Sequence, residues 1–168
     1  MKVLTVRDPW ATLLAVGAKE IETRSWFTRY RGEVAIHASK GLSADESLSS
    51  LVPPISRALD RFLPLKIAAR PEKWPRGAIV AVGTLVEIWP ITRYRGEQVV
   101  SCQVDGHDHR AGDVVTVGSE PVSDKEEGLG LYCTGRFGWL IADIRRVVPV
   151  PAKGRLGLWT FDGDLVSA

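Results

Sequence analysis

Residues 17–39 read GAKEIETRSWFTRYRGEVAIHAS, and the rest of the chain can be arranged around this segment. Five Lys and Arg and three Glu lie among its aromatic side chains or directly after them, over residues 17–40. Indole and phenol rings gain nothing from water, so this mixture is unusual for a plain solvated surface. It is typical of a pocket for a planar, anionic or hydrogen-bonding ligand.

A strand and a helix are expected before this segment, and a turn and a strand toward its end. Residues 2–7 are strand-tolerant. Asp8 can accept the free amide hydrogens of a helix start, and the apolar residues within 8–16 repeat at helical spacing. Gly17 is expected to end that helix in the left-handed conformation. A turn at 28–32 then leads into the next strand.

The remainder of the chain predicts a second helical region and several more strands. Ser43 and Glu46 have the spacing of a capping box, and Pro53 and Pro54 interrupt the helix that it opens. Trp74 is expected to anchor the following loop to the core. The predicted strands cover residues 33–38, 77–89, 114–117, 131–134, 139–148 and 157–161.

This order of elements predicts an α+β fold with a curled or closed sheet. Residues 77–89 are apolar on both faces, which is typical of a central strand. We expect this strand to pair with residues 139–148, and the helix at 8–16 to cap the open mouth of the barrel.

The composition favours one domain in the cytoplasm. The chain has 168 residues, 45% of them hydrophobic, and a net charge of +2. Cys102 and Cys133 form no Cys-x-x-Cys pair and no secretory signal is evident, so both are expected to be reduced thiols. No apolar run approaches the roughly 18 residues of a membrane span, so no membrane partner is expected.

The hexapeptide Thr-Arg-Tyr-Arg-Gly-Glu occurs twice, at 28–33 and at 92–97. The sequences around the two copies do not match, so we do not infer a structural repeat. The second copy is either another cationic and aromatic loop that faces the ligand or a solvated hairpin.

Several motifs together resemble the ASCH domain family, whose fold is the PUA-like β-barrel. They are Pro-Trp-Ala-x-Leu-Leu at 9–14, Gly-x-Lys-x-x-Glu-x-Arg-Ser-Trp at 17–26, Tyr-Arg-Gly at 30–32 and Ile-His-Ala-Ser at 36–39, followed by Gly-Ala-Ile-Val at 77–80 and Lys-Gly-Arg-Leu-Gly-Leu-Trp at 153–159. The resemblance implies a single PUA-like domain over residues 1–168, with helices at the mouth and side of the barrel. Residues 41–76 would then form a long insertion of helix and loop.

The resemblance also implies a cleft between the first helix and the sheet that suits RNA, DNA or a nucleotide. Some small members of the family remove the acetyl group of N4-acetylcytidine with a Lys–Thr–Glu set, and another is a metal-dependent ribonuclease. The lysine of that set corresponds to Lys19 and its glutamate to Glu87. The position of the threonine falls on Glu22, with Thr23 beside it, so the attacking group stays open.

A buried Lys19 could act as a base paired with Glu87, because burial lowers a lysine pKa. The plainer interpretation makes Lys19 and Glu22 an exposed ion pair worth at most about 1 kcal/mol. Glu87 follows an apolar strand, so it must reach solvent or find a buried partner, for which Lys19 or Arg24 is the expected choice.

Arginines can hold phosphates with two hydrogen bonds, and aromatic rings can stack on bases. The predicted ligand-binding residues are Trp10, Arg24, Ser25, Trp26, Arg29, Tyr30, His37, Ser39, Lys40 and Arg155. For three of them a structural role is also open: Trp10 and Trp26 as core residues, and His37 as the donor of a core hydrogen bond.

The sequence therefore predicts binding of RNA, single-stranded nucleic acid or a nucleotide through a cationic and aromatic cleft. Hydrolysis at a Lys19 and Glu87 site, as an amidohydrolase or a ribonuclease, is the alternative, and a protein-interaction module is the third. No cofactor is expected. His107 and His109 are interpreted as part of a solvated turn, so no metal site is predicted.

Overall fold

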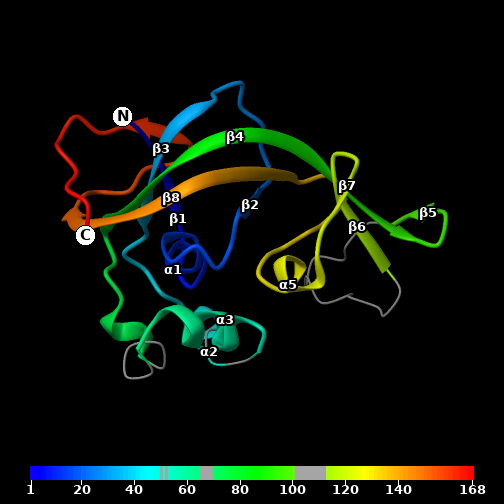
Figure 1. Cartoon of the computed structure of the whole chain (residues 1–168), viewed down its shortest axis with the longest axis horizontal. Coiled ribbons are helices and arrows are strands. Elements are labelled where there is room, and N and C mark those ends of the chain that lie inside the picture. The colour runs from blue at the N-terminus through cyan, green and yellow to red at the C-terminus, as the bar shows by residue number, and fades with distance from the viewer. Residues whose placement is uncertain (50, 52, 65–69, 101–112) are drawn as a thin grey trace.

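The computed structural model describes residues 1–49, 51, 53–64, 70–100 and 113–168. Its centre is a mixed, nine-stranded sheet whose main path runs β2-β8-β4-β3-β1-β9 (Figure 1). The strands are β1 Lys2–Val6, β2 Ile21–Arg24, β3 Gly32–Ala38, β4 Ala78–Arg95, β5 Gln98–Val99, β6 Asp113–Val117, β7 Glu120–Pro121, β8 Phe137–Pro151 and β9 Leu158–Thr160. The helical elements are α1 Trp10–Ala15, α2 Ala44–Ser49, α3 Ile55–Phe62, η1 Pro71–Lys73 and α5 Asp124–Glu127.

The two long strands β4 and β8 pair antiparallel along most of their length and curl the sheet into a half-barrel (Figure 1). The register shifts at three places between them, and such bulges bend a strand and increase its twist. The fold is α+β with the curled sheet of a PUA-like barrel, so the predicted fold class and the predicted pairing of the two central strands are confirmed.

Helix α1 forms where the sequence predicts it, and it packs into the core of the half-barrel. Oδ1 of Asp8 accepts hydrogen bonds from the amide and the hydroxyl of Thr12, at 3.1 and 2.7 Å. Gly17 ends the helix with φ of 71°. Leu14 on α1 lies in one apolar cluster with Ile36 of β3 and Trp139 of β8, which fixes the helix against the sheet.

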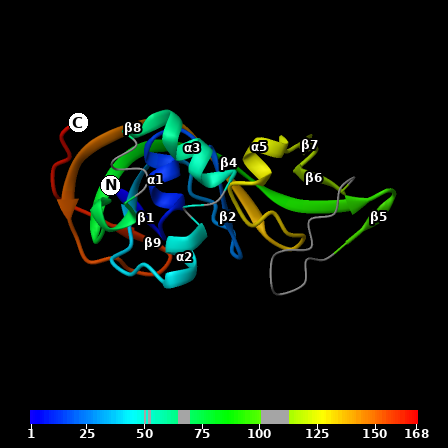
Figure 2. The same cartoon turned by 90° about the horizontal axis from the view of Figure 1, so that it is seen from below.

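Helices α2 and α3 lie on the same side of the sheet as α1 (Figure 2), and α3 packs Ile55, Ala58 and Leu59 against Leu13 of α1 in a separate apolar cluster. The predicted capping box is present: the Ser43 amide donates to Glu46 at 2.7 Å, and the Glu46 amide donates to the Ser43 hydroxyl at 3.2 Å. Trp74 is buried in this cluster with Leu59, which confirms its predicted anchoring role. Among the described residues, no helix is long and apolar enough to cross a membrane.

Three sequence predictions are wrong in part. Residues 131–133 are irregular and a turn begins at Thr134, because the Tyr132 carbonyl accepts a 3.3 Å hydrogen bond from the Arg93 side chain rather than from a strand. The second hexapeptide forms a hairpin, as one alternative held, but its Arg93 is buried rather than solvated. Cys133 is disulfide-bonded, so it is not a free thiol; Cys102 lies outside the described residues.

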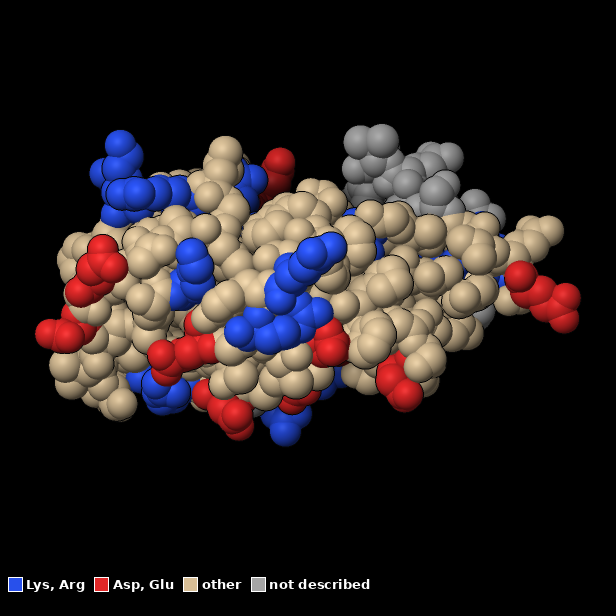
Figure 3. All heavy atoms as spheres, turned by 90° about the horizontal axis from the view of Figure 1, so that it is seen from above, with Lys and Arg blue, Asp and Glu red and all other residues tan. Residues whose placement is uncertain are grey.

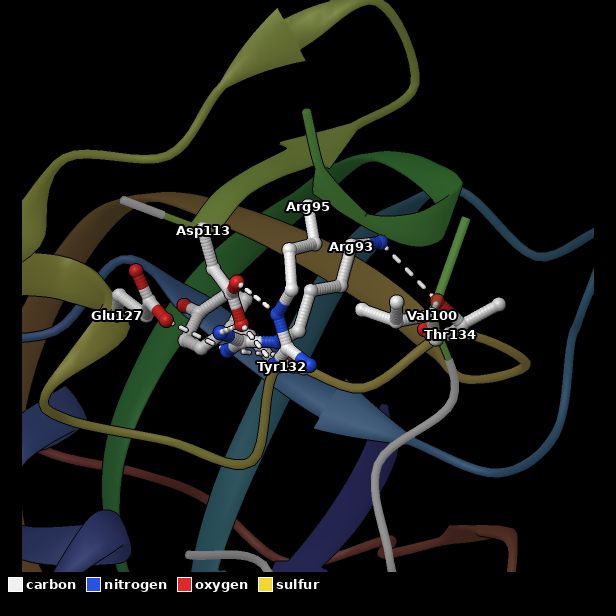
Figure 4. Close-up of polar contacts among 7 residues, drawn as sticks. All are labelled: Arg93, Arg95, Val100, Asp113, Glu127, Tyr132 and Thr134. Carbon is white, nitrogen blue, oxygen red and sulfur yellow. Dashed lines mark hydrogen bonds and ion pairs between the residues drawn. The ribbon is translucent and has the colours of Figure 1, made fainter. Parts of the chain in front are cut away.

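Beyond residue 90, β4 leaves the half-barrel and forms an arm with β5, β6 and β7, and a buried ion network ties this arm to α5 (Figure 4). Arg93 contacts Asp113 at 3.4 Å and Glu127 at 2.5 Å, and its amide donates to the Thr134 hydroxyl. Arg95 forms a second pair of hydrogen bonds to Asp113, at 2.9 and 3.1 Å. Buried charges must be paired in this way, since an isolated one is costly.

Candidate functional site

A cavity of about 950 Å³ lies where the strand ends of β1 and β3 meet the segment that follows β8. Four cationic side chains line it, from three separate parts of the chain: Lys40, Arg76, Lys153 and Arg155. Among the described residues that line it, none is Asp or Glu. Cations gathered without a counter-charge are the arrangement that an anionic ligand requires.

His37 forms part of the inner wall of this cavity and is 1% exposed. Its Nε2 lies 3.0 Å from the carbonyl oxygen of Ala152 and therefore carries the proton, since a carbonyl can only accept. Burial lowers the pKa of His37, against the opposing effect of this hydrogen bond, so the ring is neutral at neutral pH. A side chain at Gly154 would meet the ring, with its Cβ only 2.6 Å from Cε1.

Thr5 pairs with His37 across β1 and β3 and joins the cavity wall to the predicted binding segment. Its carbonyl accepts a 2.6 Å hydrogen bond from Nη2 of Arg24, and its hydroxyl accepts one of 3.1 Å from Nε1 of Trp159. Nε of Arg24 also lies 3.2 Å from the Glu22 carboxylate. Arg24 thus contacts the backbone of the lining residue Thr5 but is not itself among the residues that line the cavity.

Lys19 lies in a separate, closed polar cluster. Its side chain has no exposed surface, and Nζ lies 3.3 Å from Oε1 of Glu126 and 3.4 Å from the Tyr132 hydroxyl. Burial lowers the pKa of Lys19, while the carboxylates of Glu126 and Glu22 oppose that shift. Burial together with the Glu126 carboxylate raises the pKa of Tyr132.

The predicted pairing of Glu87 with Lys19 or Arg24 is wrong, because Glu87 pairs with Arg31. Nε of Arg31 lies 3.0 Å from Oε1 of Glu87, and Nη2 contacts the same oxygen. These hydrogen bonds lower the pKa of Glu87, whose side chain is 37% exposed. Glu87 directly follows a register shift in the β4–β8 ladder and lies opposite Leu140.

Glu22 and Thr23 are neighbours on β2 and are both buried. Successive side chains of an extended strand point to opposite faces, so these two cannot serve one site together. Glu22 contacts Arg24, whereas the backbone carbonyl of Thr23 accepts a 3.0 Å hydrogen bond from Nη2 of Arg136.

The remaining predicted binding residues divide into a packing group and an exposed group. The Trp26 ring meets Trp139 edge-on, with 4.6 Å between centroids, and Trp10 packs against two core clusters. Ser25 and Arg29 are exposed on the loop before β3, and the Tyr30 hydroxyl on that loop donates to the carbonyl of Glu33.

Of the predicted binding residues, the structure brings His37, Ser39, Lys40 and Arg155 together in the cavity. Sequence reasoning missed Thr5, Arg76, Glu126 and Tyr132, and it quoted Lys153 within a motif without naming it as a binding residue. For Glu126 a signal existed, because Ser123 and Glu126 have the capping spacing and the Glu126 amide donates to the Ser123 hydroxyl at 3.3 Å. The other three gain their place only from tertiary contacts.

The charge of the face seen from above is local rather than continuous. On this face, basic and acidic side chains are interspersed, and the basic ones form small groups (Figure 3). This pattern agrees with the modest net charge of +2.

Comparison with known proteins places this architecture in a family. The model of the ASCH domain matches residues 4–134, which is more than half of the chain. Activating signal cointegrator 1 of Homo sapiens is 33% identical over 84 residues, and that of Mus musculus is 32% identical over 84 residues. Each match covers 50% of this chain and 14% of the relative, so it concerns a small part of those longer proteins. The chain belongs to the ASCH domain family.

Proposed function

We propose that the protein binds nucleic acid or a nucleotide, preferably RNA or another single strand, and that the ligand enters the cavity beside His37. The observation that carries this proposal is the set of four cations, Lys40, Arg76, Lys153 and Arg155, around a cavity whose described lining residues include no carboxylate. The proposed place differs from the predicted cleft at Lys19 and Glu87, since Lys19 is closed to solvent.

The four cations are not neutralised by a carboxylate in the part of the chain that the structure describes. Within the described residues, none of the four forms an ion pair, so their charge is available to a ligand. The guanidinium of Arg155 lies 5.9 Å from the centre of the Trp159 ring, which holds it near the cavity wall without neutralising it.

The test is the salt dependence of binding to a short, fluorescently labelled single-stranded RNA. Replacing Lys153 and Arg155 together by alanine removes two phosphate contacts, so the slope of log Kd against log salt should flatten by about 1.4. Arg146→Ala is the matched control, because Arg146 is an exposed cation of β8 that does not line this cavity. Equal slopes for the double variant, the control and the unmodified protein would exclude the cavity as the phosphate site.

Hydrolysis of an amide on a modified nucleoside is a second candidate function. The buried Lys19, with its lowered pKa, favours it as a base. In this version Glu126, rather than Glu87, is the partner that orients the lysine. Substrate reaches Lys19 only if the chain near Gly130 moves, because a Cβ on Gly130 would lie 2.7 Å from Nζ.

This second function is tested by incubating the protein with a nucleoside panel that includes N4-acetylcytidine and measuring released acetate. Turnover that disappears in Lys19→Met but persists in Glu87→Gln would establish it. Equal acetate release by Lys19→Met and the unmodified protein would exclude Lys19 as the base. For the metal-dependent ribonuclease alternative, the described residues contain no group of three or more His, Cys, Asp or Glu able to hold a metal ion, and His107 and His109 lie outside the described residues.

A further inference from the structure

We propose that the cavity beside His37 takes a phosphomonoester, the phosphate-bearing end of its ligand, and leaves the base outside, so that binding does not depend on the base. This inference rests on the proposed function and names the chemical group that the same site recognises. It follows from which hydrogen-bonding groups of the wall are already used and which are free.

Three backbone acceptors of the wall are engaged within the protein. The Thr5 carbonyl accepts from Arg24 at 2.6 Å, the Gly77 carbonyl accepts from the Ala152 amide at 3.0 Å, and the Ala152 carbonyl accepts from His37 at 3.0 Å. The remaining acceptor of the imidazole, Nδ1 of His37, is buried, and the segment at Gly154 covers that edge of the ring.

The cationic donors of the wall are not held by carboxylates in the part of the chain that the structure describes, whereas the donors of His37 and Ser39 are engaged with the carbonyls of Ala152 and Gly41. Lys40, Arg76, Lys153 and Arg155 carry donors only, and none of them forms an ion pair within the described part of the chain. The Thr5 hydroxyl already accepts from Trp159, so its own proton remains to be donated. The carboxylate of Asp8 interacts with Arg76 through space and is itself fully buried.

A wall of donors matches a phosphate better than a base. The edge of a base presents donors and acceptors together, so reading it requires free acceptors in the protein. A phosphomonoester presents acceptors only, on three oxygens, with a charge of about −1.5 to −2 at neutral pH. A phosphodiester inside a strand offers less charge and fewer oxygens, so the end of a strand or a mononucleotide fits best.

The experiment is a competition against a labelled single-stranded RNA that carries a 5′-phosphate. The competitors are the four nucleoside 5′-monophosphates, the four matching nucleosides, ribose 5-phosphate and inorganic phosphate. All four monophosphates and ribose 5-phosphate should compete to a similar degree, and the nucleosides about tenfold or more weakly, because they lack the charged acceptor. The same RNA with a 5′-hydroxyl should also bind more weakly.

Two results would overturn the inference while leaving the proposed function intact. One is equal binding of the RNA with and without its 5′-phosphate. The other is a preference of about fivefold or more for one base, which is what direct reading of a base edge provides. If no RNA binds but calorimetry detects ribose 5-phosphate, and Lys153→Ala with Arg155→Ala abolishes that binding, the phosphomonoester site stands and the nucleic-acid function fails. If neither binds, both are overturned.

Discussion

Lys19 and Glu126 form a buried ion pair although 107 positions separate them in the sequence, with 3.3 Å between Nζ and Oε1. The Glu126 carboxylate also accepts hydrogen bonds from the amides of Glu20 and Ile21, at 3.3 and 3.1 Å. The Glu126 carboxylate therefore satisfies backbone amides at and just before the start of β2. Strand β2 is at the end of the sheet order, and unpaired backbone groups on such a strand favour pairing with another chain.

The first prediction is that Lys19 is coupled in stability to Glu126 and not to Glu87. Removing either partner of a buried pair strands the other charge, so Lys19→Met and Glu126→Gln should each cost about 3–5 kcal/mol. The double variant should lose less than the sum of the two, as measured by urea unfolding. Lys19→Met combined with Glu87→Gln is the control and should be additive; the reverse pattern would contradict the structure.

The second prediction concerns Asp8, whose carboxyl is buried and whose Oδ2 has no hydrogen-bond partner among the described residues. Asp8→Asn retains the acceptor for Thr12 and removes a buried charge, so this variant should be at least as stable as the unmodified protein at neutral pH. Asp8→Ala loses the acceptor and should cost about 1 kcal/mol. A neutral-pH urea titration in which Asp8→Asn is the weaker of the two variants would contradict this.

The raised pKa of Asp8 also predicts how the stability difference between Asp8→Asn and the unmodified protein changes with pH. Burial raises the pKa of Asp8 above 3.8, so the folded state favours the protonated carboxyl. Its contribution to stability is then fully present below pH 3.8 and is lost as the pH rises through the raised pKa. The advantage of Asp8→Asn should therefore appear at neutral pH and vanish near pH 3.8.

The third prediction concerns the arm of β4, β5, β6 and β7 at low pH. Hydrogen bonds from Arg95, and then from Arg93, lower the pKa of Asp113 from 3.8 to about 2. A lowered carboxylate pKa contributes stability above pH 3.8 that is lost as the pH falls through about 2. The difference in unfolding free energy between the unmodified protein and Asp113→Asn should be constant above pH 3.8. It should become smaller as the pH falls from 3.8 to about 2. A gap that widens on acidification would contradict the network.

Local signals were sufficient to predict much of the fold. Asp8 and Gly17 bound the first helix, Ser43 and Glu46 cap the second, and the apolar run at 77–89 marks the central strand. Each of these depends on neighbours within a few positions. The predicted strand at 131–134 failed because a side chain, that of Arg93, donates to the Tyr132 carbonyl, where strand pairing would require a backbone amide.

The candidate site was predictable only in part, because its groups come from distant parts of the chain. His37 and Arg155 were chosen for their chemistry, and the fold brings them to one cavity. The residues next to Glu87 and Lys19 in the sequence do not indicate that Glu87 pairs with Arg31, or that Lys19 pairs with Glu126. The two hexapeptides make the same point: one is a loop that leads into β3 and the other a hairpin, so their surroundings decide the structure.

The measurement that tests the account most directly is a crystal structure of the protein soaked or grown with adenosine 5′-monophosphate. The account predicts that the phosphate lies in the cavity beside His37, within hydrogen-bonding distance of Lys40, Arg76, Lys153 and Arg155, and that the adenine extends outward. A nucleotide bound instead at the loop of Ser25 and Arg29, or beside Lys19, with the cavity empty, would contradict it.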